Sequence, residues 1–280
     1  MTAIAGIVDA HIHFWKLDRG DYTALTPEMG PLLADHLPET LAPHLAAAGV
    51  DGIVVVQAAE TLAETDYLLG LAEATPFILG IVGWLDPRDE GAGATVTRGA
   101  GQPALKGYRP VVDDNVSIAW LADPACGPGL EAMARHGAVL DILVQNPDEL
   151  PFALDVARRH PDLTIVLDHC GKPDIAGGRF DEWARDIEGL ARVGHVRCKL
   201  SGLLNRAAPG AGAKAVRPYA DHVLASFGAG RVLWASDWPP LTLAGSYARW
   251  WEITDALLSG ASADERAAIL GGTARTTYGL

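Results

Sequence analysis

Eight short apolar segments recur along the chain, with helix-like segments rich in alanine and leucine between them. Each is a largely continuous apolar run rather than a clean alternation of apolar and polar residues, which is typical of strands buried on both faces of a parallel sheet. The predicted strands are residues 7–15, 52–58, 78–85, 104–109, 139–144, 164–169, 196–200 and 232–236. Their starts lie about 25 to 45 residues apart, enough for a strand, a helix and two loops. The pattern predicts an α/β fold with parallel strands.

The intervening segments carry helix signals. The first begins with Pro38 and ends at Gly49, which is common helix punctuation. The predicted helices are residues 38–49, 64–74, 131–137, 148–160, 181–194, 215–227 and 247–259, while the Gly- and Ala-rich stretches 91–101 and 207–213 are predicted surface loops.

Eight strand–helix units account for nearly all 280 residues, close to the roughly 250 residues of a typical (β/α)8 barrel. A doubly wound open sheet would usually need a Gly-rich phosphate turn, which the sequence lacks. No linker or change of composition marks a second domain. We therefore predict a single (β/α)8 TIM barrel, with one domain over residues 1–280.

Composition and charge exclude several classes of protein. The chain is 49% hydrophobic and 20% charged, which supports a large core and argues against disorder. No apolar stretch approaches the roughly 20 residues of a membrane-spanning helix, and a net charge of −13 disfavours a nucleic-acid partner. We see no secretory signal, and three scattered cysteines exclude a disulfide framework. We expect a cytoplasmic protein with a small-molecule partner, and a homo-oligomer is left open.

Polar side chains gather at the ends of the predicted strands, where a barrel of this kind has its active site. His11 and His13 end the first strand, and because side chains alternate along a strand, both face the same side. Two neutral imidazoles placed in this way can bind one divalent ion, and imidazole suits zinc. His169 ends the sixth strand and Asp237 follows the eighth. The sequence therefore predicts a convergent site.

Each of these residues also has an ordinary structural interpretation. A lone His-x-His seldom binds metal, Asp237 could cap a helix, and His169 could be a hydrogen-bonded core histidine. Their joint occurrence at the ends of three strands favours the functional interpretation.

Three segments around these residues carry a family pattern. They are Val-Asp-Ala-His-Ile-His-Phe-Trp at 8–15, Asp-His-Cys-Gly-Lys-Pro at 168–173 and Ser-Asp-Trp-Pro at 236–239. They resemble the amidohydrolase superfamily, and most closely its branch of lactonases that act on L-fuconolactone, L-rhamnonolactone, pyrone-dicarboxylate or muconolactone. The resemblance covers essentially the whole chain and is less specific for the substrate than for the branch.

The resemblance implies one divalent metal ion or none. Superfamily members with two metals carry a bridging lysine on strand 4 and a histidine on strand 5. Strand 5 has no histidine here, so Lys106 on strand 4 is not expected to bridge two metals. We predict a single zinc-like ion held by His11, His13 and Asp237, with His169 completing the shell or contacting the substrate.

The resemblance also implies that water opens a lactone ring. Asp237 is the expected general base, and can return the proton to the leaving ring oxygen; His169 is the second expected catalytic residue. A bound cation would polarise the carbonyl, and without one His11, His13 and His169 could donate hydrogen bonds to the same oxygen. Covalent catalysis is disfavoured because the sequence has no Gly-x-Ser-x-Gly motif.

Six further side chains at strand ends are expected to bind substrate: Trp15, Trp84, Lys106, Arg109, Lys172 and Trp238. Tryptophan faces suit a sugar ring, and Arg109 could bind a hydroxyl or a carboxylate; packed tryptophans and a structural arginine ion pair are the alternatives. A dicarboxylate should need several arginines, so we predict hydrolysis of a neutral L-fucono-, L-galactono- or L-rhamnono-lactone to the aldonic acid. The alternatives are a hydrolase or decarboxylase of another ring substrate, or a non-catalytic binding protein. Residues 16–37 are expected to cover the barrel mouth.

Overall fold

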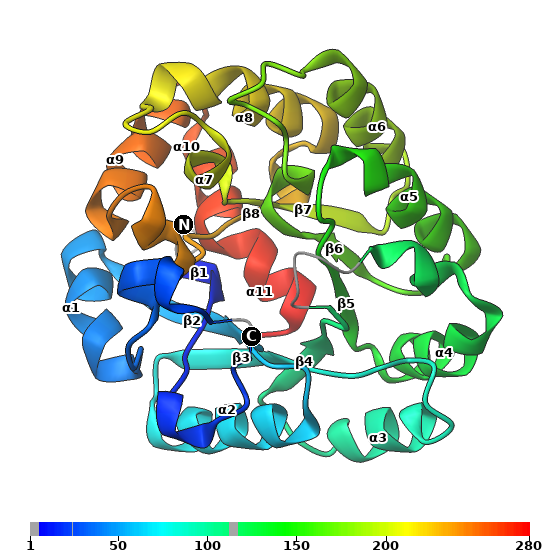
Figure 1. Cartoon of the computed structure of the whole chain (residues 1–280). Coiled ribbons are helices and arrows are strands. Elements are labelled where there is room, and N and C mark those ends of the chain that lie inside the picture. The colour runs from blue at the N-terminus through cyan, green and yellow to red at the C-terminus, as the bar shows by residue number, and fades with distance from the viewer. Residues whose placement is uncertain (1–5, 24, 112–116) are drawn as a thin grey trace.

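The computed structural model describes residues 6–23, 25–111 and 117–280. Eight parallel strands pair in chain order from first to last, with helices around them (Figure 1). The strands are β1 (Ile7–Ile12), β2 (Val50–Val56), β3 (Ile78–Gly83), β4 (Leu105–Tyr108), β5 (Val139–Ile142), β6 (Ile165–Leu167), β7 (Val196–Leu200) and β8 (Val232–Trp234). This arrangement confirms the predicted (β/α)8 barrel.

The carboxyl ends of β1 and β8 close the barrel. Ile12 and Trp238 form a parallel bridge, His13 N donates to Trp238 O at 2.9 Å, and Asp237 N donates to His11 O at 3.0 Å. The two polar segments predicted from opposite ends of the sequence are thus fastened to each other by backbone hydrogen bonds.

The helices form the outer layer, except the last one, which packs against the barrel interior (Figure 1). They are α1 (Pro38–Ala48), α2 (Leu62–Ala74), α3 (Ala92–Gly99), α4 (Gly127–His136), α5 (Leu150–Arg159), α6 (Asp181–Ala191), α7 (Leu203–Arg206), α8 (Ala213–Phe227), α9 (Tyr247–Leu257), α10 (Ala263–Ala267) and α11 (Thr273–Tyr278). None of the helices in the described ranges is both long and apolar enough to span a bilayer.

The prediction of a surface loop over residues 91–101 is wrong, because α3 lies there. Ala92 and Val96 are buried, and a Cβ at Gly93 would lie 3.9 Å from Ala132 of α4. Small residues therefore let α3 and α4 approach closely, and this packing outweighs the low helix propensity of glycine.

The core has two parts. One apolar cluster lies inside the barrel, where valines of β2, β3, β5 and β6 meet Ala274 and Tyr278 of α11, and a larger one lies between the sheet and the helices. The segment before α11 packs on the amino end of β1, since a Cβ at Gly271 would lie 2.3 Å from Gly6 O. The C-terminal elements therefore close the amino end of the barrel and leave the carboxyl end for the site.

The described residues of the segment 16–37 pack against α2 around a small core of their own. The core contains Trp15, Tyr22 and Leu32, all buried. The fully buried Glu64 of α2 accepts hydrogen bonds from Tyr22 Oη at 2.8 Å and from Ala58 N at 3.0 Å. One carboxylate thus joins this segment to the end of β2.

Burial raises the pKa of Glu64 from an ordinary 4.5 to about 7. The folded protein therefore holds this proton more tightly than the unfolded chain, and the stability contributed by protonated Glu64 is lost as the pH rises from about 4.5 through 7. We expect the free energy of unfolding of Glu64→Gln, measured by urea unfolding, to rise relative to that of wild type by roughly 2–3 kcal/mol between pH 5 and pH 8. Glu90→Gln, which removes an exposed carboxylate, is the control; an equal gain in both variants would contradict the assignment.

Candidate active site

The end of β1 carries two buried histidines whose rings approach each other. His11 Nε2 lies 3.1 Å from His13 Nε2, and a shift in register between Asp9 and Ile12 accompanies this turn of the strand. His13 Nδ1 lies 2.8 Å from Val56 O. Because a carbonyl oxygen can only accept, His13 carries its proton on Nδ1 and presents the lone pair of Nε2 to the site.

His169 and Asp237 lie in tight turns after β6 and β8. Both have left-handed backbone conformations, with φ of 50° at His169 and 63° at Asp237, which residues other than glycine rarely adopt. His169 Nδ1 lies 2.9 Å from Ser201 Oγ, and Asp237 O accepts from Leu241 N at 2.8 Å. Such strained conformations gather at functional sites because the surroundings hold the side chain in one position.

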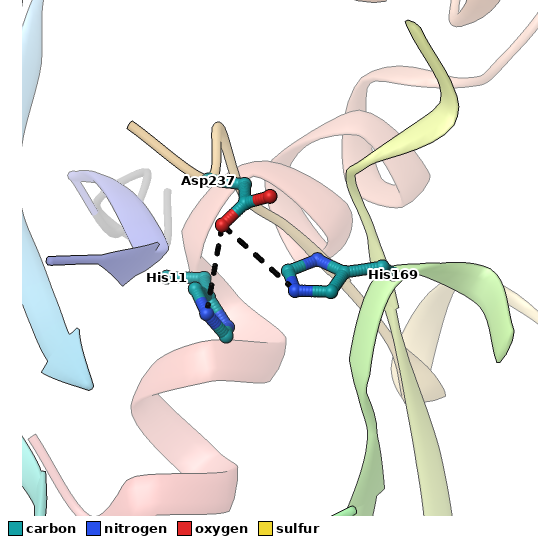
Figure 2. Close-up of side chains that lie close together, drawn as sticks. All are labelled: His11, His169 and Asp237. Atoms are coloured by element: carbon teal, nitrogen blue, oxygen red, sulfur yellow. Dashed lines mark ion pairs between the residues drawn. The ribbon is translucent and has the colours of Figure 1, made fainter. Parts of the chain in front are cut away.

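The four predicted residues converge at the carboxyl end of the barrel. Asp237 Oδ1 lies 3.5 Å from His13 Nε2 and 3.8 Å from Nε2 of both His11 and His169. Figure 2 shows the Asp237 carboxylate pointing between the rings of His11 and His169. The structure therefore brings three imidazole nitrogens and one carboxylate oxygen to a single point.

These four side chains fit a divalent metal ion. Zinc is bound by imidazole and carboxylate at about 2.0–2.2 Å, which places neighbouring ligand atoms of a tetrahedron roughly 3.3 Å apart. His11 Nε2 lies 3.1 Å from His13 Nε2, and Asp237 Oδ1 lies 3.5 to 3.8 Å from the three imidazole nitrogens, which is close to this value. His11, His169 and Asp237 each offer one ligand atom within 4.8 Å of the others. The donor set thus suits a single ion.

The charge states suit the same chemistry. Burial lowers the pKa of His11 and of His169 below the ordinary value, so both rings are neutral. Burial alone would raise the pKa of Asp237, but His169, His13 and Arg109 outweigh it and lower the pKa below its usual value. A carboxylate is therefore available as a base, with neutral imidazoles beside it.

A layer of buried charges lies directly beneath the histidines. Lys199 Nζ of β7 lies 2.5 Å from Asp141 Oδ2 of β5 and 3.0 Å from Asp168 Oδ1, and all three side chains are fully buried. Tyr278 Oη donates to Asp141 at 2.9 Å. Buried charges are tolerated only when paired and hydrogen-bonded, and here every charge has an opposite partner.

Arg109 extends this layer to the next strand end. Its Nη1 lies 3.3 Å from Asp168 Oδ2 and 3.4 Å from His11 Nε2, and its Nη2 donates to Gln57 O at 2.8 Å. The sequence left a substrate contact and a structural ion pair open for this residue. The structure forms the ion pair and places it at the edge of the site.

The three candidate tryptophans differ in exposure. Trp15 and Trp238 are each 3% exposed, and both rings pack against His36, at centroid distances of 4.9 and 5.2 Å. Trp84 is half-buried, with its Nε1 donating to Pro110 O at 3.0 Å. The packing alternative therefore describes Trp15 and Trp238, and Trp84 presents the most ring surface.

The two candidate lysines have different positions. Lys172 is buried in a left-handed conformation, and its N–H donates to His169 O at 2.9 Å, so it lies in the same turn as His169. Lys106 lies toward the amino end of β4, where Nζ donates to Gly279 O at 2.9 Å. The prediction that Lys106 binds substrate is wrong, because the residue is at the opposite end of the barrel from the histidines.

The sequence interpretation missed Lys199, Asp141, Asp168 and Ser201 as parts of the site. The first three could have been suspected, because a charged residue in or next to an apolar strand needs a partner inside the fold. Ser201 follows β7 and had no such signal.

Comparison with known proteins shows the family to which the chain belongs. The family model described as Amidohydrolase matches residues 8–280, and the chain therefore belongs to the amidohydrolase family. It is 39% identical over 278 residues to an L-fucono-1,5-lactonase of Burkholderia ambifaria, covering 97% of this chain and 94% of that protein. An L-fucono-1,5-lactonase of Burkholderia multivorans is 34% identical, with 98% and 96% covered.

A solved structure shares the whole fold. The crystal structure of an amidohydrolase from Burkholderia multivorans with bound zinc superposes with a TM-score of 0.91 at 33% identity, covering 99% of this chain and 100% of that chain.

Proposed function

We propose that the protein hydrolyses a neutral sugar lactone of the L-fucono-, L-galactono- or L-rhamnono- type to the aldonic acid. The Asp237 carboxylate converges with three imidazole nitrogens, which provides a base beside groups that stabilise an oxyanion. This convergence is the main support for hydrolysis as the reaction class. The full-length similarity to two L-fucono-1,5-lactonases supports the substrate class.

Asp237 is the general base of the proposed reaction. Its lowered pKa keeps it ionised at neutral pH, so it can take a proton from water as the water oxygen bonds to the lactone carbonyl carbon. When the bond between this carbon and the ring oxygen breaks, Asp237 returns the proton to the departing alkoxide. Asp237 therefore both accepts the proton and returns it within one reaction cycle.

His169 holds the lactone carbonyl oxygen. If the Ser201 hydroxyl donates to Nδ1, the ring's single proton lies on Nε2, which faces the Asp237 carboxylate 3.8 Å away. This N–H can donate to the carbonyl oxygen as negative charge develops on it. His13 cannot do the same as a neutral ring, because its proton is bound to Val56 O.

We propose zinc as the divalent ion, held by His11, His13 and Asp237 with His169 beside them. When bound, such an ion would polarise the carbonyl and lower the pKa of water. The imidazole–carboxylate donor set supports this choice, as does the zinc in the similar Burkholderia multivorans structure.

We expect no more than one tightly bound divalent ion per chain. A second group of possible ligands, His11, Asp141 and Asp168, surrounds the Lys199 ammonium, and its positive charge takes the place of a metal there. Elemental analysis after zinc saturation and desalting should give at most one equivalent. Two equivalents, or a carboxylated Lys106 found by mass spectrometry, would contradict this expectation.

Paired cations support a neutral substrate. The charge of Arg109 is offset by Asp168, and that of Lys199 by Asp141. A dicarboxylate ring would require arginine forks that are not already engaged. The same chemistry makes the decarboxylase and pyrone-hydrolase alternatives less well supported.

A pH-indicator assay on a panel of lactones tests the proposal, because hydrolysis releases an acid. We expect L-fucono- and L-galactono-lactones to be hydrolysed with far higher kcat/KM than pyrone dicarboxylate or muconolactone. The reverse order would overturn the substrate assignment, and no hydrolysis of any lactone would overturn the reaction class.

We also propose that residues 1–280 act as one domain in the cytoplasm. The family match over residues 8–280 supports the first point. Three free, buried cysteines support the second, because unpaired thiols suit a reducing compartment.

A further inference from the structure

The ammonium group of Lys199 has a complete set of hydrogen-bond acceptors. Besides Asp141 Oδ2 at 2.5 Å and Asp168 Oδ1 at 3.0 Å, Nζ lies 2.9 Å from His11 Nδ1. An ammonium has three N–H donors and no lone pair. All four side chains are fully buried, so water does not replace any of these partners. Lys199 therefore donates one of its three N–H hydrogen bonds to His11 Nδ1.

This contact determines where His11 carries its own proton. Because Lys199 can only donate, Nδ1 must accept, and the single proton of the neutral ring lies on Nε2. The other side of the ring agrees: Nε2 is 3.1 Å from His13 Nε2, which is an acceptor because the His13 proton is bound to Val56 O. Lys199 and His13 thus both favour the Nε2–H tautomer of His11.

The opposite tautomer has weaker support. A proton on Nδ1 would find Asp168 Oδ1 at 3.3 Å and leave Nε2 to accept from Arg109 Nη1 at 3.4 Å. It would also place the His11 Nδ1–H against an N–H of Lys199 at 2.9 Å. The lone pairs of His11 Nε2 and His13 Nε2 would then face each other at 3.1 Å. The two short contacts outweigh the two long ones, since hydrogen bonds weaken toward 3.5 Å.

We propose that Lys199 is a positioning residue that holds His11 as the Nε2–H tautomer and so makes it a hydrogen-bond donor, to His13 Nε2 in the free enzyme and to the reacting oxygen when substrate is bound. The use of that N–H rests on the proposed lactone hydrolysis, whereas the tautomer does not. Binding of a divalent ion through His11 Nε2 requires the proton to move to Nδ1, where Asp168 accepts it. Lys199 therefore opposes metal binding at His11 and Asp168 supports it.

The tautomer can be measured directly in the wild-type protein. Nitrogen-15 NMR distinguishes the two neutral tautomers of each imidazole, and the His11 signals are those missing from His11→Asn. In metal-stripped protein we expect the Nε2–H pattern for His11, and on addition of zinc the Nδ1–H pattern with Nε2 ligated. An Nδ1–H pattern in the metal-stripped protein would overturn the proposal.

Lys199→Met removes the donor while keeping a side chain of similar length. We expect His11 to change to the Nδ1–H tautomer, zinc to bind about tenfold more tightly, and kcat of the metal-stripped enzyme to fall more than KM changes. Lys106→Met is the matched control, because Lys106 bonds a backbone carbonyl at the far end of the barrel; it should leave the His11 signals and zinc affinity unchanged.

Loss of Lys199 leaves Asp141 without its cation, whereas Asp168 keeps Arg109, so circular dichroism must first show that the variant folds. If it does not, Lys199→Met with Asp141→Asn removes one charge of each sign and is measured instead. A folded variant that keeps the Nε2–H tautomer overturns the proposal. If wild type shows this tautomer yet hydrolyses no lactone, the tautomer assignment stands and the proposed function fails.

Discussion

Asp237→Asn is expected to lower kcat about 10³-fold to 10⁴-fold while the protein remains folded. A general acid–base group typically contributes 10²–10⁴ in rate, and Asp237 is both the proton acceptor and the returning donor in the proposed reaction. Asparagine has nearly the same shape and tolerates the left-handed conformation at φ 63°. The amide cannot take a proton from water, so steady-state kinetics of the metal-stripped protein on the preferred sugar lactone measures the loss of the base.

Asp255→Asn is the control for this substitution. Asp255 forms an ion pair with Arg266 on the surface, far from the strand ends, and such pairs contribute little to stability. Its kcat should equal that of wild type. If Asp237→Asn retained wild-type kcat at an unchanged circular dichroism spectrum, another residue would have to be the base.

The barrel could be predicted because each of its strands can be recognised separately in the sequence. Continuous apolar segments indicate parallel strands, and eight of them at regular spacing leave few other architectures. The convergence of His11 and Asp237 followed from topology, since a closed barrel brings the last strand beside the first. Neither inference required knowledge of any side-chain contact.

The turns after the strands could not be predicted in the same way. The sixth strand was expected to run to residue 169, yet β6 ends at Leu167 and His169 and Cys170 adopt left-handed conformations. Neither histidine nor cysteine routinely adopts the left-handed conformation, so no local sequence preference predicts it. The conformation is imposed by the surrounding packing and by the hydrogen bond between Ser201 and His169.

The buried charge layer also depends on information that the sequence holds only in part. Asp141 and Lys199 each interrupt an apolar strand, which indicates that a partner exists without naming it. Their strands are separated by β6, so the pair forms across the barrel interior and not between neighbours. Only the tilt and stagger of the closed sheet bring the two side chains together.

Gly202→Ala is expected to reduce kcat about 100-fold by displacing His169. A Cβ at Gly202 would lie 2.7 Å from His169 Cβ and 3.0 Å from its Cγ, closer than real contacts allow. The neighbouring atoms belong to the stem of the ring, which is held by strained backbone and by Ser201, so His169 must shift as a whole. Misplacement of a catalytic group by about 1 Å can cost 10² in rate.

Gly137→Ala separates this effect from simple backbone strain. Gly137 is the C-cap that follows α4, and its φ of 68° is nearly the 69° of Gly202, but an added Cβ there meets open space. Both variants should lose about 1 kcal/mol of unfolding free energy from the left-handed conformation, and Gly202→Ala more because of the clash. Only Gly202→Ala should also change the imidazole NMR signals of His169 and lower kcat. If the two variants lost equal stability and neither lost activity, the ring of His169 would not depend on the space that Gly202 leaves.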